Sequence, residues 1–198
     1  MSLALRLLEG HIPAVARRAA LRRLFATTAV AFGCPVPPLG GLDADALLRR
    51  YAQFTRDQAE AALRGGRDLP ALQDRLERGA RVLGARLRAG LRVRTAEDAM
   101  AAARMVYGLL DIDLRGTRDG EITVRRCAFS DLYSVEVCRL DGALDSGLLA
   151  GLSGGDRLEF TQRITEGAPC CLARLRPVPT TRAAAGAWDS RTVRRRVG

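Results

Sequence analysis

The strongest constraint on the fold is a change of pattern near Asp111. Before it, apolar residues recur every three or four positions, which is the period of an amphipathic helix. After it, the segment 121–127 alternates apolar with polar residues and is rich in β-branched side chains, which is typical of a strand. A run of helices followed by a run of strands argues against repeated βαβ units. We therefore predict an α+β fold in which an N-terminal helical half packs on a small antiparallel sheet in the C-terminal half.

The predicted domain covers residues 1–176 of the 198. Its helical part spans 1–110, and its sheet part, which carries most of the cysteines, spans 111–176. Residues 177–198 are dominated by Pro, Thr, Ala and Arg without periodicity. Such a segment cannot bury enough apolar surface to offset the entropy of ordering, so we expect a disordered basic tail.

Helix signals divide the first part into four segments. Asp43 or Asp45 can cap the second helix, and Thr95 with Asp98 three residues later resembles a capping box for the fourth. The predicted ranges are 3–32 with a break or restart at Pro13, 43–63, 69–88 and 96–110.

The second part begins with a turn signal over residues 115–120. Residues 132–138 fit a strand or a helix, and a helix over 143–152 is entered from Asp141, which serves as its cap. The last two strands form an antiparallel pair if they make a hairpin. The predicted strands are 121–127, 157–165 and 170–175.

The formal net charge is +10, and every basic side chain is arginine. A GC-rich genome accounts for arginine in place of lysine, but not for the excess of positive charge, part of which lies in residues 177–198. A basic body could attract an anionic ligand or nucleic acid. We do not expect nucleic acid as a partner, because no helix-turn-helix pattern is convincing and aromatic residues make up only 5% of the chain.

The apolar stretches are too short for a membrane span, which needs about 18 or more apolar residues. Charged residues such as Arg6 and Glu9 interrupt the N-terminal apolar stretch, which argues against a signal peptide. We therefore expect a cytoplasmic protein, and the odd number of cysteines agrees with free thiols. The expected partner is a small-molecule substrate, and homo-oligomerisation stays open.

A cluster of cysteines marks the sheet part as the place for chemistry. A small sheet could bring three thiolates together, which would suit Zn²⁺. There is no CxxC or Cys/His spacing and the single histidine is far away in sequence, so we expect no metal and no cofactor. The other interpretations are a nucleophilic thiolate and small buried apolar side chains. The clustered residues are Cys127, Cys138 and the adjacent Cys170 and Cys171, of which only one can face a pocket from a strand.

Charged side chains near the cysteines supply further candidates. Arg163 could lower the pKa of a neighbouring thiol, or clamp a substrate carboxylate with its bidentate fork. It is predicted on the strand face opposite Phe160 and Ile164. Each acidic side chain by itself is more often a surface or capping residue than an acid–base group. The acidic candidates are Asp131, Glu136, Asp141 and Asp145.

The C-terminal pattern resembles the L-2-amino-thiazoline-4-carboxylic acid hydrolase family, over roughly residues 95–176. It also overlaps with the vinyl-4-reductase type of small-ligand domain. The chain departs from the pattern in its tail, in its doubled cysteine and in Leu172-Ala173, near which the family usually has Phe. The residues that carry the resemblance are Cys127-Ala-Phe129, Cys138, Asp141 or Asp145, Arg163-Ile-Thr165 and Gly167-Ala-Pro-Cys170.

The resemblance implies hydrolytic opening of a small sulfur- and nitrogen-containing heterocyclic acid by a cysteine thiolate, in specialised metabolism. It favours Cys170 over Cys171. The alternative is a non-catalytic small-molecule-binding or accessory protein that uses the same pocket. The expected catalytic residues are Cys127, Cys138, Cys170 and Asp145, and the expected substrate-binding residues are Arg163, Thr165, Phe129 and Tyr133.

Overall fold

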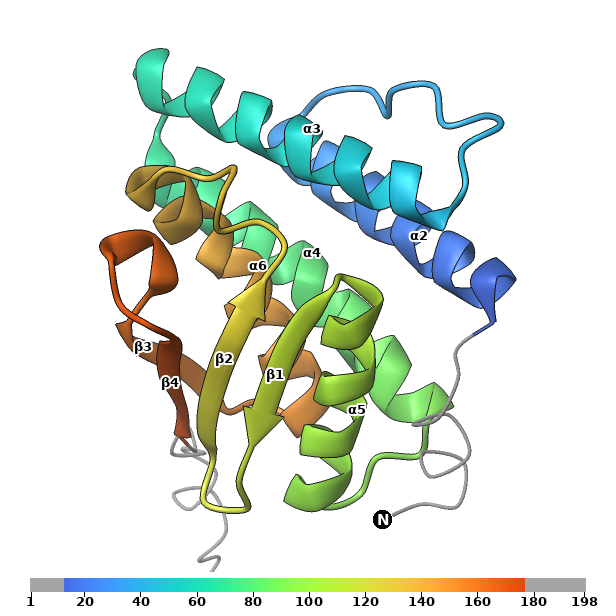
Figure 1. Ribbon diagram of the computed structural model, residues 1–198, viewed down its shortest axis with the longest axis vertical. Helices are drawn as coiled ribbons and strands as arrows, with labels where there is room; N and C mark the ends of the chain where they lie inside the picture. The colour runs from blue at the N-terminus through green and yellow to red at the C-terminus, as the bar shows by residue number, and fades with distance from the viewer. Residues whose placement is uncertain (1–12, 177–198) are drawn as a thin grey trace, which may run out of the picture.

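The computed structural model describes residues 13–176, which form helices packed on one small sheet (Figure 1). The predicted segment 3–12 with His11, and the predicted tail 177–198, lie outside the described residues. The helices are α2 (Ala14–Phe32), α3 (Ala44–Arg64), α4 (Leu69–Gly90), α5 (Ala96–Leu109) and α6 (Val135–Ser153), with a short 3₁₀ helix η1 (Ile164–Glu166).

Local capping fixes where several helices begin. The Asp43 carboxylate accepts the backbone N–H of Ala46 at 2.7 Å, so Asp43 rather than Asp45 caps α3. Thr95 and Asp98 form the reciprocal capping box of α5. These helix starts are therefore confirmed. None of the helices in the described range is both long enough and apolar enough to cross a membrane.

Four antiparallel strands form the sheet, in the order β1-β2-β4-β3. The hairpin between the last two strands and the α+β fold are confirmed. The strands are β1 (Ile112–Gly116), β2 (Glu121–Cys127), β3 (Arg157–Gln162) and β4 (Cys171–Arg176).

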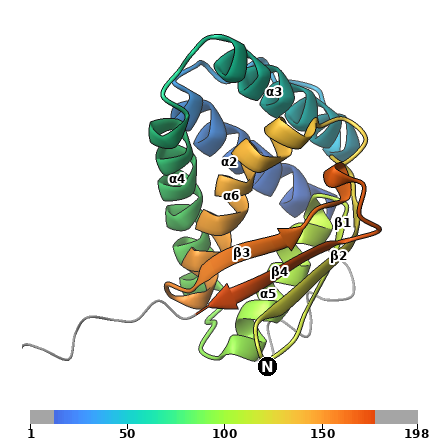
Figure 2. The ribbon, with the colours of Figure 1, turned by 90° about the vertical axis from the view of Figure 1, so that its left-hand side faces the viewer.

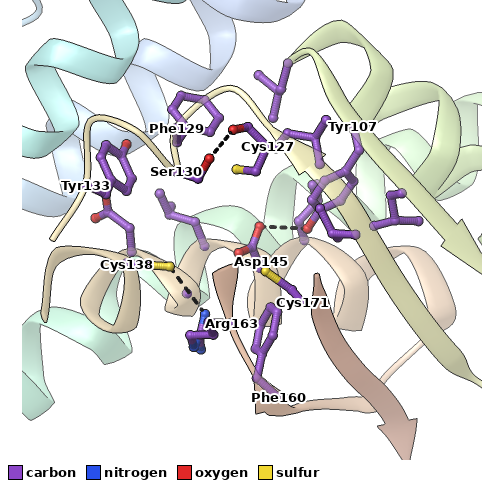
Figure 3. A pocket seen from close by; sticks show the side chains of 18 of the residues that line it. Tyr107, Cys127, Phe129, Ser130, Tyr133, Cys138, Asp145, Phe160, Arg163 and Cys171 are labelled. Carbon is purple, nitrogen blue, oxygen red and sulfur yellow. Dashed lines mark hydrogen bonds between the residues drawn. The ribbon is translucent and has the colours of Figure 1, made fainter. Parts of the chain in front are cut away.

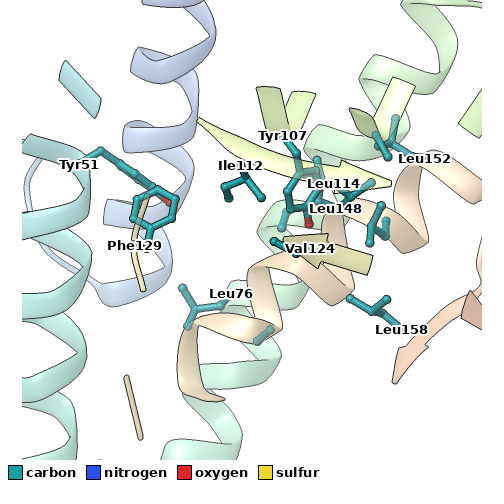
Figure 4. Packing of buried hydrophobic residues seen from close by; sticks show 14 of the residues in the cluster. Tyr51, Leu76, Tyr107, Ile112, Leu114, Val124, Phe129, Leu148, Leu152 and Leu158 are labelled. Carbon is teal, nitrogen blue, oxygen red and sulfur yellow. The ribbon is translucent and has the colours of Figure 1, made fainter. Parts of the chain in front are cut away.

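One face of this sheet is apolar and faces the helices, and the other carries charge. On the outer face, Arg174 pairs with Glu121 at 2.6 Å and Arg176 pairs with Glu159 at 2.8 Å. This division is the ordinary behaviour of an antiparallel sheet with one solvated face. The inner face joins a hydrophobic cluster that reaches through the helices (Figure 4), and its strand members include Ile112, Leu114, Ile122, Val124, Leu158, Ala173 and Leu175.

Helix α6 lies between α4 and the sheet (Figure 2). Glycines let the two helix backbones approach closely. A Cβ built on Gly147 would overlap the carbonyl oxygen of Glu77, and one on Gly151 would overlap that of Arg81. These glycines cost helix propensity, but they bring α6 far enough into the molecule to present its other side to the sheet.

The structure corrects the predicted course of two segments. Residues 112–116, expected to be partly turn, form strand β1, and only residues 117–120 turn. Helix α6 begins at Val135, with Ser134 as its cap, and runs through the ambiguous segment. Asp141 is therefore not a cap but a residue in the middle of a helix.

The ends of the last two strands also differ from the prediction. The pairing of β3 with β4 is irregular between Phe160 and Gln162, and β3 stops at Gln162 instead of running to Thr165. Residues 164–166 form η1, and β4 begins at Cys171 rather than Cys170. The loss of regular alternation here decides which side chains reach the interior.

Candidate functional site

A cavity of about 120 Å³ lies between the inner face of the sheet and the helices (Figure 3). Its volume is comparable with the ~150 Å³ engineered cavity that holds benzene. Most of the wall is apolar, and the polar groups come from α3, α5, α6, the strands β2 and β4, and the segments before α6 and after β3. The aliphatic wall includes Leu83, Ile112, Leu114, Val124, Leu148 and Leu158.

Helix α6 contributes the residues at positions 138, 141, 142 and 145 to the cavity. Their spacing of three or four residues places them on one face of the helix. Asp145 accepts a hydrogen bond from the Tyr107 hydroxyl at 2.7 Å. Burial raises the pKa of Asp145, and the Tyr107 hydrogen bond and the Arg163 charge only partly oppose this rise.

Asp141 is the most deeply buried acid of the site, with 7% of its surface exposed. Neither carboxyl oxygen has a hydrogen-bond partner of ordinary geometry among the described residues. Burial holds the pKa of Asp141 well above its usual range, although the nearby Tyr133 hydroxyl acts in the opposite direction. The Thr165 hydroxyl oxygen, which lines the same cavity, is also buried without a partner.

Three thiols line the cavity, and their surroundings differ. Burial raises the pKa of Cys127 to about 12, so this thiol is protonated at neutral pH. Burial also raises the pKa of Cys171, whose sulfur accepts the backbone N–H of Ile164 at 3.3 Å. Cys138 lies in the first turn of α6 and is the thiol that accepts a hydrogen bond from Arg163, at 3.8 Å from Nη1.

Arg163 closes one end of the cavity. Its guanidinium lies over the Phe160 ring, 3.8 Å from the ring centroid, and a Cβ on Gly142 would lie 2.9 Å from Nη2. The prediction that Arg163 faces away from Phe160 is therefore wrong, because β3 ends before it. No carboxylate among the described residues forms an ion pair with Arg163.

The other end of the cavity is aromatic. The Phe129 and Tyr133 rings are tilted to each other with centroids 5.4 Å apart, and Tyr51 lies edge-on to Phe129 at 6.2 Å. The Tyr51 hydroxyl pairs with Thr28 at 3.0 Å, and the Tyr133 hydroxyl pairs with Thr55. The first pair joins α3 to α2, and the second joins the loop before α6 to α3.

The structure brings together most of the predicted site residues. Cys170 is the exception, because it does not line the cavity and its sulfur accepts instead from Gln162 Nε2 at 3.4 Å. Cys171 lines the cavity because it pairs with Val124, an inner-face residue of β2. Residues directly opposite each other on paired strands share a face. The predicted residues that line the cavity are Cys127, Phe129, Tyr133, Cys138, Asp145, Arg163 and Thr165.

Sequence reasoning missed part of the site and misassigned another part. Tyr51 and Tyr107 were not considered, because each is one aromatic among many apolar residues of a helix. The prediction of Asp141 as a helix cap is wrong, but Asp141 is also one of the four acidic candidates, and its spacing from Cys138 and Asp145 places all three on one helix face. Asp131 and Glu136 are exposed and do not line the cavity.

The metal-ligating side chains of residues 13–176 do not form a group of three or more that could hold a metal ion. No protein-family profile matches the chain, and no curated protein is detectably similar to it. The case for a function therefore depends on the geometry of the cavity.

Proposed function

We propose that this protein binds one small molecule, about the size of a substituted benzene ring, in the cavity between α6 and the sheet. The observation that carries the proposal is an apolar and aromatic cavity of about 120 Å³ into which a few polar groups converge. Small-molecule sites are typically apolar concavities in which few polar groups fix the orientation of the ligand. Two of those polar side chains, Asp141 and Thr165, have buried oxygens without partners, which is costly unless a bound group satisfies them.

The test is a thermal-shift and calorimetric titration of the full chain with toluene and benzyl alcohol. We expect both probes to bind and to raise Tm. Replacing Cys127 by the longer Met fills the cavity and should abolish the shift, whereas Cys34→Met, at a cysteine outside the cavity, should preserve it. A protein that binds neither probe, or a Cys127→Met variant that binds them unchanged, would contradict the proposal.

A second candidate function, hydrolysis, is favoured by the contact between Cys138 and Arg163. Cysteine hydrolases use the sulfur as nucleophile, and this contact places a guanidinium beside the Cys138 sulfur, where it can also bind a substrate carboxylate. In this proposal the Cys138 thiolate adds to the amidine carbon of a cyclic substrate such as 2-amino-thiazoline-4-carboxylate. The ring C–S bond breaks, its electron pair stays on sulfur, and protonated Asp145 gives that sulfur its proton. Water then displaces the enzyme thiol and leaves N-carbamoyl-cysteine, while Arg163 holds the carboxylate.

Mass spectrometry of the reaction mixture tests this second candidate. We expect the substrate to gain one water, and we expect Cys138→Ser to lower the rate by at least about a hundredfold because the nucleophile is removed. Cys34→Ser, at a cysteine far from the cavity, is the matched control and should retain full activity. Product formation that survives Cys138→Ser, or no product with the wild-type chain, rejects cysteine catalysis on this substrate.

A further inference from the structure

The polar end of the cavity holds buried oxygens that lack hydrogen-bond partners. They are both oxygens of Asp141, which accept when ionised, and the hydroxyl oxygen of Thr165, which can accept or donate. Asp145 receives one donor, from Tyr107, at its Oδ1 atom. An ionised carboxylate has room for about four hydrogen bonds, so this pair of acids can accept several more. A ligand that satisfies this end must therefore bring donors.

Several hydroxyl donors of the wall are already engaged. The Thr55 hydroxyl donates to the Tyr51 carbonyl oxygen at 3.0 Å, and the Ser130 hydroxyl donates to the Cys127 carbonyl oxygen at 2.8 Å. The Tyr133 hydroxyl, which pairs with Thr55, is the wall donor that acts on Asp141. A carboxylate can accept about four hydrogen bonds, so Asp141 keeps room for donors from a ligand.

The charges of the site also favour a ligand that brings hydrogen-bond donors. Two carboxyl groups, Asp141 and Asp145, face the cavity, and the guanidinium of Arg163 is the charge that opposes them. Arg163 does not form an ion pair with either acid and instead contacts Phe160, Gly142 and Cys138. A cation bound beside Asp141 would lower the raised pKa of this carboxyl and favour its ionised form, because opposite charges stabilise each other. The Phe129 and Tyr133 rings line the same space and offer aromatic surface to a cation.

We propose that the ligand is a small organic cation, whose ammonium or amidinium group pairs with Asp141 while its apolar body fills the space along the sheet. This inference rests on the proposed binding function and adds the chemical class of the ligand. An ammonium carries three donors and an amidinium four, which matches the unpartnered acceptors. Hydrogen bonds to charged groups are also stronger than those between neutral groups.

Calorimetric titration of the full chain with probes of one size and different charge tests the proposal. The probes are benzylamine, benzamidine, benzyl alcohol and benzoate. We expect the two cations to bind on the order of tenfold or more tighter than benzyl alcohol, with benzoate the weakest. Asp141→Asn should remove the preference for the cations and preserve benzyl alcohol binding. Asp131→Asn, the same change at an exposed aspartate, should leave the preference intact.

The comparison of the four probes on the wild-type protein needs no variant, so it tests the cation proposal even if Asp141→Asn folds poorly. Benzyl alcohol binding as tightly as benzylamine, or benzoate binding tightest, overturns the cation proposal while leaving small-molecule binding in place. A cation preference that survives in Asp141→Asn also overturns it, because another group would then be responsible. If neither benzyl alcohol nor any other probe binds, the binding function and the cation proposal both fail.

Discussion

At the scale of single residues, Asp141 stands out because the fold holds its carboxyl where water cannot reach it. It is 7% exposed, without an ordinary hydrogen-bond partner, on a helix that packs on both sides. Burying an unpaired acid is costly, and the group responds by keeping its proton to a higher pH. The residue therefore makes a contribution to stability that depends on pH.

Asp141→Asn should stabilise the empty protein at neutral pH. The pKa of Asp141 is raised above its ordinary value of 3.8, so the native state binds the proton more tightly than the unfolded state does. The contribution of Asp141 to the free energy of unfolding of the wild-type protein therefore falls as the pH rises from 3.8 toward the pKa of Asp141 in the native state. We expect the variant to gain roughly 1–3 kcal/mol at about pH 7 and nothing near pH 3.8.

Urea unfolding of both proteins at these two pH values measures the difference. Asp145 also has a raised pKa, and its charge contributes to raising the pKa of Asp141, so the measured gain includes the coupling between the two acids. Equal gains at the two pH values would show that the effect of the substitution does not come from the proton. A variant that is more stable yet loses the preference for cations would identify Asp141 as a residue retained for binding.

At the scale of elements, the contact between α4 and α6 determines whether the cavity exists. The glycines at 84, 147 and 151 let the two backbones touch, and the opposite side of α6 then carries Cys138, Asp141 and Asp145 to the sheet. A side chain at the glycine positions would push α6 away from α4. The site residues of α6 and the glycines that contact α4 therefore lie on two sides of the same helix.

Gly147→Ala should destabilise the protein by roughly 1–3 kcal/mol, because its Cβ would overlap the Glu77 carbonyl and the cost is that of overpacking. Gly90→Ala is the matched control, since a Cβ there meets no atom within 4 Å. We expect it to be neutral or stabilising by up to about 1 kcal/mol, because alanine has the higher helix propensity. Midpoints of chemical denaturation measure both. Similar losses in the two variants would mean that the contact tolerates a methyl group.

Elements whose ends depend on local chemistry could be predicted from the sequence. The capping box at Thr95 and Asp98 is an example, and the alternation of residues 121–127 is another. Strand β1 could not be predicted, because Ile-Asp-Leu-Arg-Gly is short and its pairing with β2 is a long-range contact. The start of α6 was ambiguous because residues 132–138 fit the periodicity of a strand as well as that of a helix. In the folded chain the Ser134 side chain accepts the backbone N–H of Val137 and caps the helix.

At the scale of the whole molecule, the site combines residues of widely separated segments. Its charged residues, Asp145 and Arg163, could be predicted because they lie among the clustered cysteines in the sequence. The choice of Cys171 over Cys170 could not, because it depends on the register of β4 with β2. Tyr51 and Tyr107 reach the cavity only through the packing of α3 and α5, for which the sequence offers no local signal.

Arg163 and Phe160 belong to two spaces at once. They line the cavity, and they also line a polar groove of about 610 Å³ between α4, α6 and β3. At this place the same side chains line both spaces, so side chains alone separate the cavity from the groove. The speed with which a bound molecule exchanges by this route depends on how quickly the stacked Arg163 and Phe160 side chains change rotamer. Residence time is then set by these two side chains and affinity by Asp141, so selection could alter one without altering the other.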